Sequence, residues 1–273
     1  MSHTAILMAA PNGARKTHDD HPNLPVNIDE TVAEAERCHA AGATVLHAHV
    51  RGDSAEHVLD PERYRELFQA MAVRVPGMLL QMTTEAVGRY TPRQQAECVY
   101  ALKPQMISLA VREMAAVDSD LDLAATFYRW TAENGVHVQH IVYDAGDLQR
   151  LFALQDLGII PQGRLCTLFV LGRYLENRES EPLDIEPFLK IKADRTMDWF
   201  VCAFGSREQD CVLSALRQGG HGRIGFENNL LRPDGSVADN SAEQIATLRS
   251  TAEAEGITIA DSGQTISILG LSS

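Results

Sequence analysis

The stretch ATVLHAHVRGD, residues 43–53, joins an apolar strand to two histidines. Its valines and leucine are typical of a buried strand, and His47 and His49 stand near its C-terminal end. Side chains two positions apart in a strand point to the same face, so the two imidazoles are expected to lie side by side. Their ring nitrogens could bind one metal ion at about 2.0–2.1 Å each. The pair indicates either a metal site or two hydrogen-bonded core histidines, and a third ligand would decide between them.

Short apolar runs alternate with amphipathic stretches on both sides of residues 43–53. The expected strands are residues 4–10, 43–50, 78–82, 105–110, 136–143, 165–170, 199–204 and 222–226. The expected helices are residues 29–41, 61–73, 92–102, 121–133, 145–157, 185–191, 206–218 and 242–255. Strands and helices that alternate in this way predict an α/β fold, a closed (β/α)8 TIM barrel, as a single domain over residues 1–273.

An open, doubly wound sheet is the alternative fold. Such a sheet usually carries a glycine-rich phosphate-binding turn after its first strand. Here the polar segment PNGARKTHDDHPNLP, residues 11–25, follows that strand instead. Loops of this length are commonly functional, and the barrel is the better prediction.

The composition of the 273 residues excludes several classes of function. The formal net charge of −13 argues against sequence-independent binding to nucleic acid, which needs a basic surface. The chain contains no apolar run of 18 residues, so no membrane span is expected. Its five cysteines are scattered and never form a CxxC pair, which indicates reduced thiols and a cytoplasmic location.

In a barrel, the residues at the C-terminal ends of the strands build the active site. The polar residues there are Asn12, Arg15, Thr83, Thr84, Glu85, Ser108, Arg112, Glu113, Gln139, His140, Asp144, Arg223, Glu227, Asn228 and Asn229. Glu227 is the best candidate for a third ligand, because two histidines and one carboxylate form a catalytic zinc site or a non-haem iron site. The alternative is a solvated carboxylate that pairs with Arg223.

Three stretches strongly resemble the β-keto acid cleavage enzymes, which include the 3-keto-5-aminohexanoate cleavage enzyme. They are NGA at residues 12–14, HPNLPVNIDETVAEAERCHAAGATVLHAHVR at residues 21–51 and GGHGRIGFENN at residues 219–229. The resemblance implies a zinc-dependent (β/α)8 enzyme with acetyl-CoA as co-substrate. Such enzymes convert a 3-keto acid and acetyl-CoA into acetoacetate and a shortened acyl-CoA.

The resemblance also implies roles for individual residues. The zinc ligands of the family fall on His47, His49 and Glu227, and its catalytic arginine falls on Arg223. The groups that hold the substrate carboxylate fall on Thr83, Thr84 and Ser108. A zinc ion would act as a Lewis acid on the keto oxygen, and Arg223 would stabilise the negative charge that develops there.

Two departures from the family concern the general base. The family aspartate that follows the zinc glutamate is Asn228 here, and an amide cannot take a proton. A family glutamate near the end of the fifth strand falls near Gln139 or Ile141. We expect Asn228 to orient a substrate or water, and we expect a carboxylate elsewhere to be the base. Glu113 is the first candidate, followed by Glu85, Asp144 and His140.

A third departure concerns the charge of the substrate. Arg15 stands where the aminohexanoate enzymes carry a glutamate that suits a substrate ammonium group. An arginine would repel an amine and attract a carboxylate or a hydroxyl. The sequence therefore predicts a neutral or anionic 3-keto acid.

Two other functions remain open at this point. Amidohydrolase-type metal hydrolases also use an HxH pair, but on the first strand and with histidines on the fifth and sixth. Here the pair is on the second strand, and His140 is the residue that keeps this reading open. A metal-loaded binding protein without turnover is the other alternative, supported by Asn228. The family tends towards homotetramers, so a homo-oligomer is expected.

Overall fold

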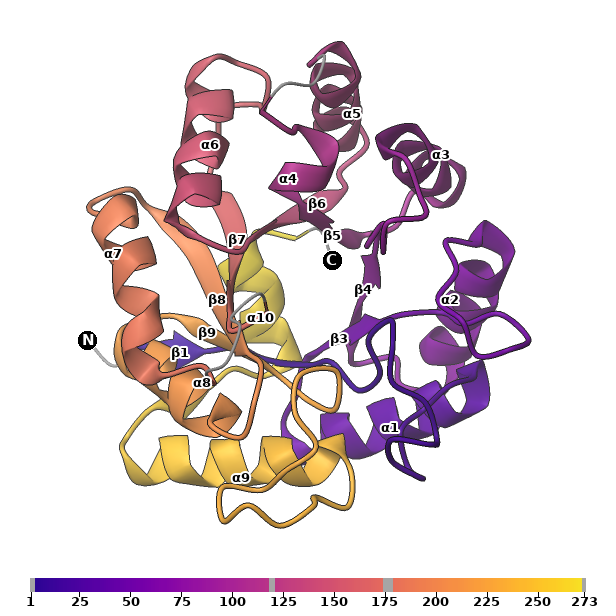
Figure 1. The fold of residues 1–273 in the computed structure, drawn as a ribbon, viewed down its shortest axis with the longest axis vertical. Helices are drawn as coiled ribbons and strands as arrows, with labels where there is room; N and C mark the ends of the chain where they lie inside the picture. Colours follow the sequence, from indigo (N-terminus) through magenta and orange to yellow (C-terminus); the bar gives the residue numbers. More distant parts are fainter. Residues whose placement is uncertain (1–2, 118–120, 174–178, 272–273) are drawn as a thin grey trace.

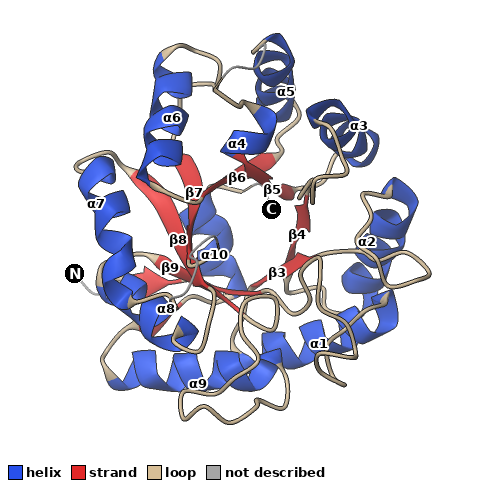
Figure 2. Cartoon of the chain, viewed as in Figure 1, coloured by secondary structure: helices blue, strands red, loops and turns tan. Residues whose placement is uncertain are grey.

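The computed structural model describes residues 3–117, 121–173 and 179–271, and a closed barrel of eight parallel strands forms its centre. The barrel strands are β2 (Leu7–Ala9), β3 (Val45–Ala48), β4 (Leu79–Thr83), β5 (Met106–Ala110), β6 (His137–Val142), β7 (Leu165–Leu171), β8 (Met197–Ala203) and β9 (His221–Ile224). Each strand pairs with the next in the sequence, and β9 closes the ring against β2. Helices surround this inner ring of strands (Figures 1 and 2), which confirms the (β/α)8 barrel.

The helices agree with the predicted ones to within two residues. They are α1 (Ile28–Ala41), α2 (Pro61–Arg74), α3 (Pro92–Leu102), α5 (Asp122–Glu133), α6 (Ala145–Asp156), α7 (Glu186–Lys192), α8 (Glu208–Arg217) and α9 (Ser241–Ala254). The side chain of Asn27 caps α1 by accepting a hydrogen bond from the Glu30 amide. Thr91 and Gln94 form a capping box at the start of α3. The helix boundaries are therefore set by local side chains.

The structure corrects the prediction at both ends of the chain. The expected strand 4–10 is divided, because β1 (Thr4–Ala5) pairs with β10 (Thr258–Ile259) outside the barrel. Neither β10 nor the helix α10 (Ser262–Leu269) was predicted, nor were the short α4 (Val111–Met114) and the 3-10 helix η1 (Pro182–Ile185). In Figure 1, α10 lies behind the ring of strands. Its Leu269 packs with Ile6 and Met8, so α10 closes the N-terminal end of the barrel.

Apolar and polar side chains divide the barrel interior along its axis. An apolar cluster that includes Ile6, Met8 and Phe200 fills the end near α10. Buried polar groups such as Gln81 and Arg223 lie on the strands nearer the other end. The interior at the C-terminal ends of the strands is thus available for chemistry. No helix of the described residues is long and apolar enough to cross a membrane.

Candidate active site

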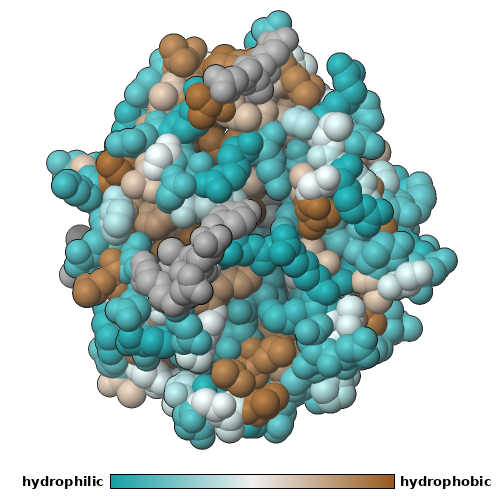
Figure 3. Space-filling model, viewed as in Figure 1, coloured by the Kyte–Doolittle hydropathy of each residue, from teal (hydrophilic) through white to brown (hydrophobic). Residues whose placement is uncertain are grey.

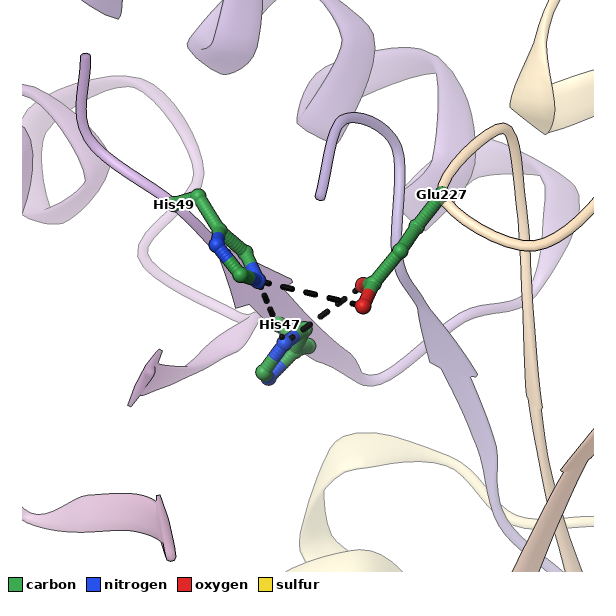
Figure 4. Close-up of side chains that lie close together, drawn as sticks. All are labelled: His47, His49 and Glu227. Atoms are coloured by element: carbon green, nitrogen blue, oxygen red, sulfur yellow. Dashed lines mark hydrogen bonds and ion pairs between the residues drawn. The ribbon is translucent and has the colours of Figure 1, made fainter. Parts of the chain in front are cut away.

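The structure brings His47, His49 and Glu227 together at the C-terminal end of the barrel. The two Nε2 atoms of His47 and His49 lie 3.2 Å apart. The carboxylate of Glu227 lies 3.5 Å from His47 Nε2 and 3.8 Å from His49 Nε2. Figure 4 shows that the three side chains point toward one another. One ligand atom from each residue falls within 4.8 Å of the others, so a single ion could contact all three.

The electrostatics of this cluster match a divalent metal. Burial and the nearby charge of Arg223 lower the pKa of His47 to about 4, and burial also lowers the pKa of His49. Burial alone would raise the pKa of Glu227, but Arg223 and His47 lower it. Near pH 7 the cluster therefore offers two neutral imidazoles and one carboxylate, which is a donor set that suits zinc.

One buried oxygen of the cluster has no hydrogen bond within the described residues, although His47 Nε2 lies 3.5 Å from it. Oε2 of Glu227 accepts no hydrogen bond from any described residue. A buried carboxylate oxygen without a partner is costly, and a cation between the three ligands would satisfy it. The residues present thus fit a zinc ion with two histidine ligands and one glutamate ligand.

The segments NGA, residues 12–14, and HAHVR, residues 47–51, hold each other in place at the histidines. The side chain of Asn12 accepts a hydrogen bond from the His49 amide and donates one to the His49 carbonyl, at 3.2 and 2.8 Å. Arg51 is buried and donates to carbonyls in the loop after β2, including those of Gly13 and Lys16. The loop after β2 is therefore fastened directly to the end of β3.

The loop after β9 is fixed in the same way and positions Glu227. The Glu227 amide donates to the Ala10 carbonyl at 3.0 Å. Gly225 has a φ of +149°, and a Cβ there would lie 2.4 Å from the Ala10 oxygen, so only glycine permits this approach. Lys16 Nζ donates to the carbonyls of Phe226 and Glu227 at 3.0 and 2.7 Å. The close approach to Ala10 explains why a glycine stands between Arg223 and Glu227.

Replacement of Gly13 by alanine is expected to weaken metal binding. Gly13 has a φ of +61°, and a Cβ there would lie 2.5 Å from Cγ of Glu227. Gly235→Ala is the matched control, because its φ is +84° but no atom lies within 4 Å. Both variants should lose roughly 1–2 kcal/mol of stability from backbone strain. In a zinc competition titration, only Gly13→Ala should lose affinity, by about 10–100-fold. Equal affinities in the two variants would show that Gly13 does not position Glu227.

Arg223 lies against the cluster with free donors. Its Nη2 is 3.4 Å from Oε1 of Glu227 and 3.4 Å from the sulfur of Cys202. Its Nε and Nη1 atoms are buried and have no partner among the described residues. A fixed guanidinium with two unpartnered donor nitrogens beside a metal site can stabilise a negative oxygen.

A small cavity of about 20 Å³ adjoins the three ligands and Arg223. Its other lining residues are Thr83, Glu85, Ile141, Tyr143, Val170, Arg173 and Phe204. Glu85 accepts a hydrogen bond from Arg173 at 3.1 Å, and one of its oxygens lies 3.9 Å from His49 Nδ1. Burial and the charge of Glu227 raise the pKa of Glu85, while the charges of Arg173 and Arg15 act against this. Glu85 is the second carboxylate in this lining.

Several residues predicted from the sequence lie outside the cavity lining. Glu113 accepts hydrogen bonds from the Ala86 amide and from Gln95, so it supports the loop after β4. Thr84 donates to the Ser108 carbonyl, and Ser108 is itself buried. Of the predicted substrate groups, Thr83 lines the cavity, whereas Arg15 is exposed.

The side-chain amide of Asn228 does not line the cavity and instead contacts the buried carboxyl group of Glu208. Its Nδ2 donates to Glu208 at 2.9 Å, and the Gly225 amide donates to the same oxygen at 3.1 Å. Burial raises the pKa of Glu208 to about 8. Asn228 therefore ties the loop after β9 to the start of α8.

Four residues that hold the site together were not predicted from the sequence. They are Lys16, Arg51, Gln81 and His57. Gln81 stands opposite His47 in the parallel register of β3 and β4, and its Oε1 lies 2.8 Å from His47 Nδ1. Gln81 could have been predicted, because a glutamine within an apolar strand indicates a polar partner inside the barrel. The positions of Lys16, Arg51 and His57 depend on loop geometry.

A larger cavity of about 360 Å³ adjoins the first and shares Tyr143, Val170 and Arg173 with it. Its outer wall is apolar and includes Leu171, Leu183, Pro187 and Phe188. Figure 3 shows that the surrounding face is largely hydrophilic, with scattered hydrophobic areas. This cavity offers an apolar extension to a polar metal site.

A family model described as beta-keto acid cleavage enzyme matches residues 4–271. The chain belongs to this family. One similar protein is the 3-keto-5-aminohexanoate cleavage enzyme of Acetoanaerobium sticklandii, which is 28% identical to this chain over 98% of both chains. The 3-oxoadipate:acetyl-CoA acetyltransferase of Cupriavidus necator is 26% identical over 100% of this chain and 97% of its own. The chain is thus a coenzyme-A-dependent transferase that cleaves carbon–carbon bonds.

Solved structures share the barrel fold of this chain. A ternary complex of ObcA with a C4-CoA adduct and oxalate superposes with a TM-score of 0.74 and 16% identity, over 92% of this chain and 68% of that one. A type I 3-dehydroquinate dehydratase from Clostridium difficile gives a TM-score of 0.61 at 9% identity, over 93% and 94%. Both likenesses concern the barrel alone.

The structure does not support an amidohydrolase-type metal site. Within the described residues, the metal-ligating cluster consists of His47, His49 and Glu227. His140 lies 3.1 Å from the Cys166 carbonyl through Nδ1 and does not line the cavity. No histidine from a later strand therefore joins the pair on β3 in the described part of the chain.

Proposed function

We propose that this enzyme uses zinc to convert a 3-keto acid and acetyl-CoA into acetoacetate and a shortened acyl-CoA. The observation that carries the proposal is the buried cluster of His47, His49 and Glu227 beside the free donors of Arg223. The names of the relatives agree, because they include a cleavage enzyme for a keto acid and an acetyl-CoA acetyltransferase.

The chemistry requires that the keto acid lose a proton from C2 and become a carbon nucleophile. A bound zinc ion would supply a Lewis acid at the keto oxygen. Arg223 would donate from Nε or Nη1 to the oxygen on which negative charge develops. C2 then attacks the acetyl carbonyl, CoA transfers to the former keto carbon, and cleavage of the C2–C3 bond releases acetoacetate.

We assign the proton transfer from C2 to Glu85. It lines the cavity next to the metal ligands, whereas Glu113 and Asn228 are engaged elsewhere. Arg173 holds one oxygen of Glu85 at 3.1 Å and leaves the other near the cluster. A general base must lie within hydrogen-bond reach of the proton that it removes, and the place of Glu85 in the cavity lining supports this role for a substrate held beside the metal ligands.

The co-substrate would extend into the larger cavity. A space of about 20 Å³ cannot hold a keto acid and a thioester together. The adjoining 360 Å³ cavity has an apolar wall, and the charge of its Arg112 is matched by Asp144 and Asp147 at 2.9 and 2.7 Å. Such a lining suits the uncharged pantetheine arm of coenzyme A better than a phosphate.

Arg15 is exposed, so its charge is expected to have only a small effect on which 3-keto acid the enzyme prefers. Arg15→Glu should lower kcat/KM for a 3-keto dicarboxylate relative to an amino-substituted 3-keto acid. The expected change in this ratio is about 2–5-fold, as for exposed charge pairs, since Arg15 is solvated. Arg129→Glu on the outer helix α5 is the charge-matched control. A wild-type preference for the amino substrate would remove Arg15 from the specificity determinants.

A coupled assay tests the function as a whole. The zinc-loaded enzyme is incubated with acetyl-CoA and a panel of neutral, dicarboxylic and amino-substituted 3-keto acids. We expect acetoacetate and the corresponding acyl-CoA to form in equal amounts for at least one neutral or anionic acid. Keto acid consumption that does not depend on acetyl-CoA would contradict the proposal.

The location and assembly of the enzyme are also proposals. All five cysteines are buried and unpaired in the described structure, which agrees with a reducing compartment such as the cytoplasm. We propose a homotetramer in solution, and light scattering coupled to size exclusion measures it directly.

A further inference from the structure

His57 lies behind His49, on the side away from the metal cluster. It belongs to the loop between β3 and α2 and is 3% exposed. The ring of His49 lies between the rings of His47 and His57, with centroid distances of 5.1 and 5.0 Å. We propose that His57 is a positioning residue that holds His49 in the tautomer with an unprotonated Nε2. This inference rests on the zinc site of the proposed function.

The first step fixes the proton on His57 itself. Its Nε2 lies 2.9 Å from the carbonyl oxygen of Glu85. A backbone carbonyl can only accept a hydrogen bond, so Nε2 of His57 must carry the proton. The guanidinium groups of Arg51 and Arg89 stand next to His57 and favour its neutral ring, because they disfavour a further positive charge. In a neutral imidazole with a proton on Nε2, Nδ1 has a free lone pair.

The lone pair on Nδ1 of His57 fixes the position of the proton on His49. Nδ1 of His49 lies 3.3 Å from Nδ1 of His57. A hydrogen bond between two ring nitrogens needs one proton, and His57 has none at that atom. His49 therefore donates from Nδ1, which leaves its Nε2 unprotonated. That Nε2 is the atom that faces His47 and Glu227.

His57 opposes the tautomer of His49 that carries its proton on Nε2. The carboxylate of Glu227, 3.8 Å from His49 Nε2, would favour a proton on that nitrogen when no metal is bound. A proton there would block the lone pair that a metal needs. The acceptor at His57 Nδ1 stabilises the opposite tautomer, and so His49 is ready to bind before the ion arrives.

The surrounding backbone holds His57 where this role requires it. A bridge between Arg51 and His57 and a hydrogen bond from the Val58 amide to the Val50 carbonyl close the loop after β3. The Glu85 carbonyl is held in turn, because the Glu85 amide donates to Thr83 Oγ1 at 3.1 Å. Metal-bound histidines commonly donate their second N–H to a fixed acceptor, and here that acceptor is a second imidazole.

The direct test is ¹⁵N NMR of the metal-free protein with labelled histidine. Wild-type His49 should show the shifts of a protonated Nδ1 and an unprotonated Nε2. In His57→Phe, which keeps a ring but lacks the acceptor, the proton should move to Nε2 in a substantial fraction of molecules. His57→Gln, whose side-chain oxygen can accept, should restore the wild-type pattern. A protonated Nε2 in the wild-type protein would overturn the proposal, whatever the variants do.

Zinc affinity provides a second readout that does not depend on turnover. By competition with a chelator, His57→Phe should bind zinc about 10–100-fold more weakly than wild type, and His57→Gln should recover most of the loss. His137→Phe is the control, because this half-buried ring on β6 has no partner at Nε2 among the described residues. Unchanged affinity in His57→Phe would contradict the role of His57. Tight zinc binding without acetoacetate formation would contradict the proposed function alone.

Discussion

Alanine at His47, His49 or Glu227 is expected to remove bound zinc and acetoacetate formation together. Each residue supplies one of three ligand atoms that lie within 4.8 Å of one another, so no described side chain can replace a lost one. A bound metal contributes several kcal/mol of transition-state stabilisation, and we expect each variant to lose about 10³-fold or more in kcat/KM.

Metal analysis of the purified variants checks this prediction. The wild-type enzyme should contain about one zinc per chain, and the three variants should contain little. His18→Ala is the control, because His18 is an exposed histidine that pairs with Glu30 outside the cluster. Full zinc occupancy in a variant that lacks both His47 and His49 would show that the metal binds elsewhere.

Replacement of Glu85 by glutamine is expected to lower kcat by about 10²–10⁴-fold, the usual contribution of a general base. The change keeps the size of the side chain and its position next to Arg173, but it removes the ability to take a proton from C2. Zinc content should remain near wild type, because the Glu85 carboxylate lies 3.9 Å from Nδ1 of His49, whereas the atom of His49 that faces His47 and Glu227 is Nε2.

Glu113→Gln is the matched comparison for Glu85→Gln. Glu113 is also a half-buried carboxyl group, whose pKa is raised by desolvation to about 7, but it contacts Ala86 and Gln95 outside the cavity lining. We expect less than about a tenfold loss from it. Asn228→Asp should not accelerate the reaction, because Asn228 contacts Glu208. A larger loss in Glu113→Gln than in Glu85→Gln, or a much faster Asn228→Asp enzyme, would show that Glu85 is not the base.

The barrel and the metal cluster could be predicted because both depend on short-range patterns. Alternating apolar strands and capped helices define the (β/α)8 order, and the i, i+2 spacing of His47 and His49 places both rings on one side of a strand end. Glu227 could be paired with them because the strand ends of a barrel meet at one face. The divided first strand could not be foreseen, since the apolar run TAILMAA has no polar residue at Ile6, where β1 and β2 separate.

The sequence could not show whether Glu85 or Glu113 faces the cavity as the candidate base. Both follow the end of a strand, and either could face the barrel axis. The four-residue helix α4 carries Glu113 toward Gln95 on α3, whereas Glu85 follows β4 directly and meets Arg173. The role of His57 depends likewise on a loop that returns to β3 and on one backbone carbonyl. Such contacts arise from tertiary packing and have no sequence period.

The most direct test of the account follows labelled carbon through the reaction. The enzyme is supplied with an unlabelled 3-keto acid and acetyl-CoA that carries ¹³C at both acetyl carbons, and the products are observed by ¹³C NMR. Attack of C2 on the acetyl carbonyl predicts acetoacetate labelled at its keto and methyl carbons, together with an unlabelled acyl-CoA. Labelled acetate, or label in the acyl group of the new thioester, would contradict the proposed carbon–carbon bond exchange.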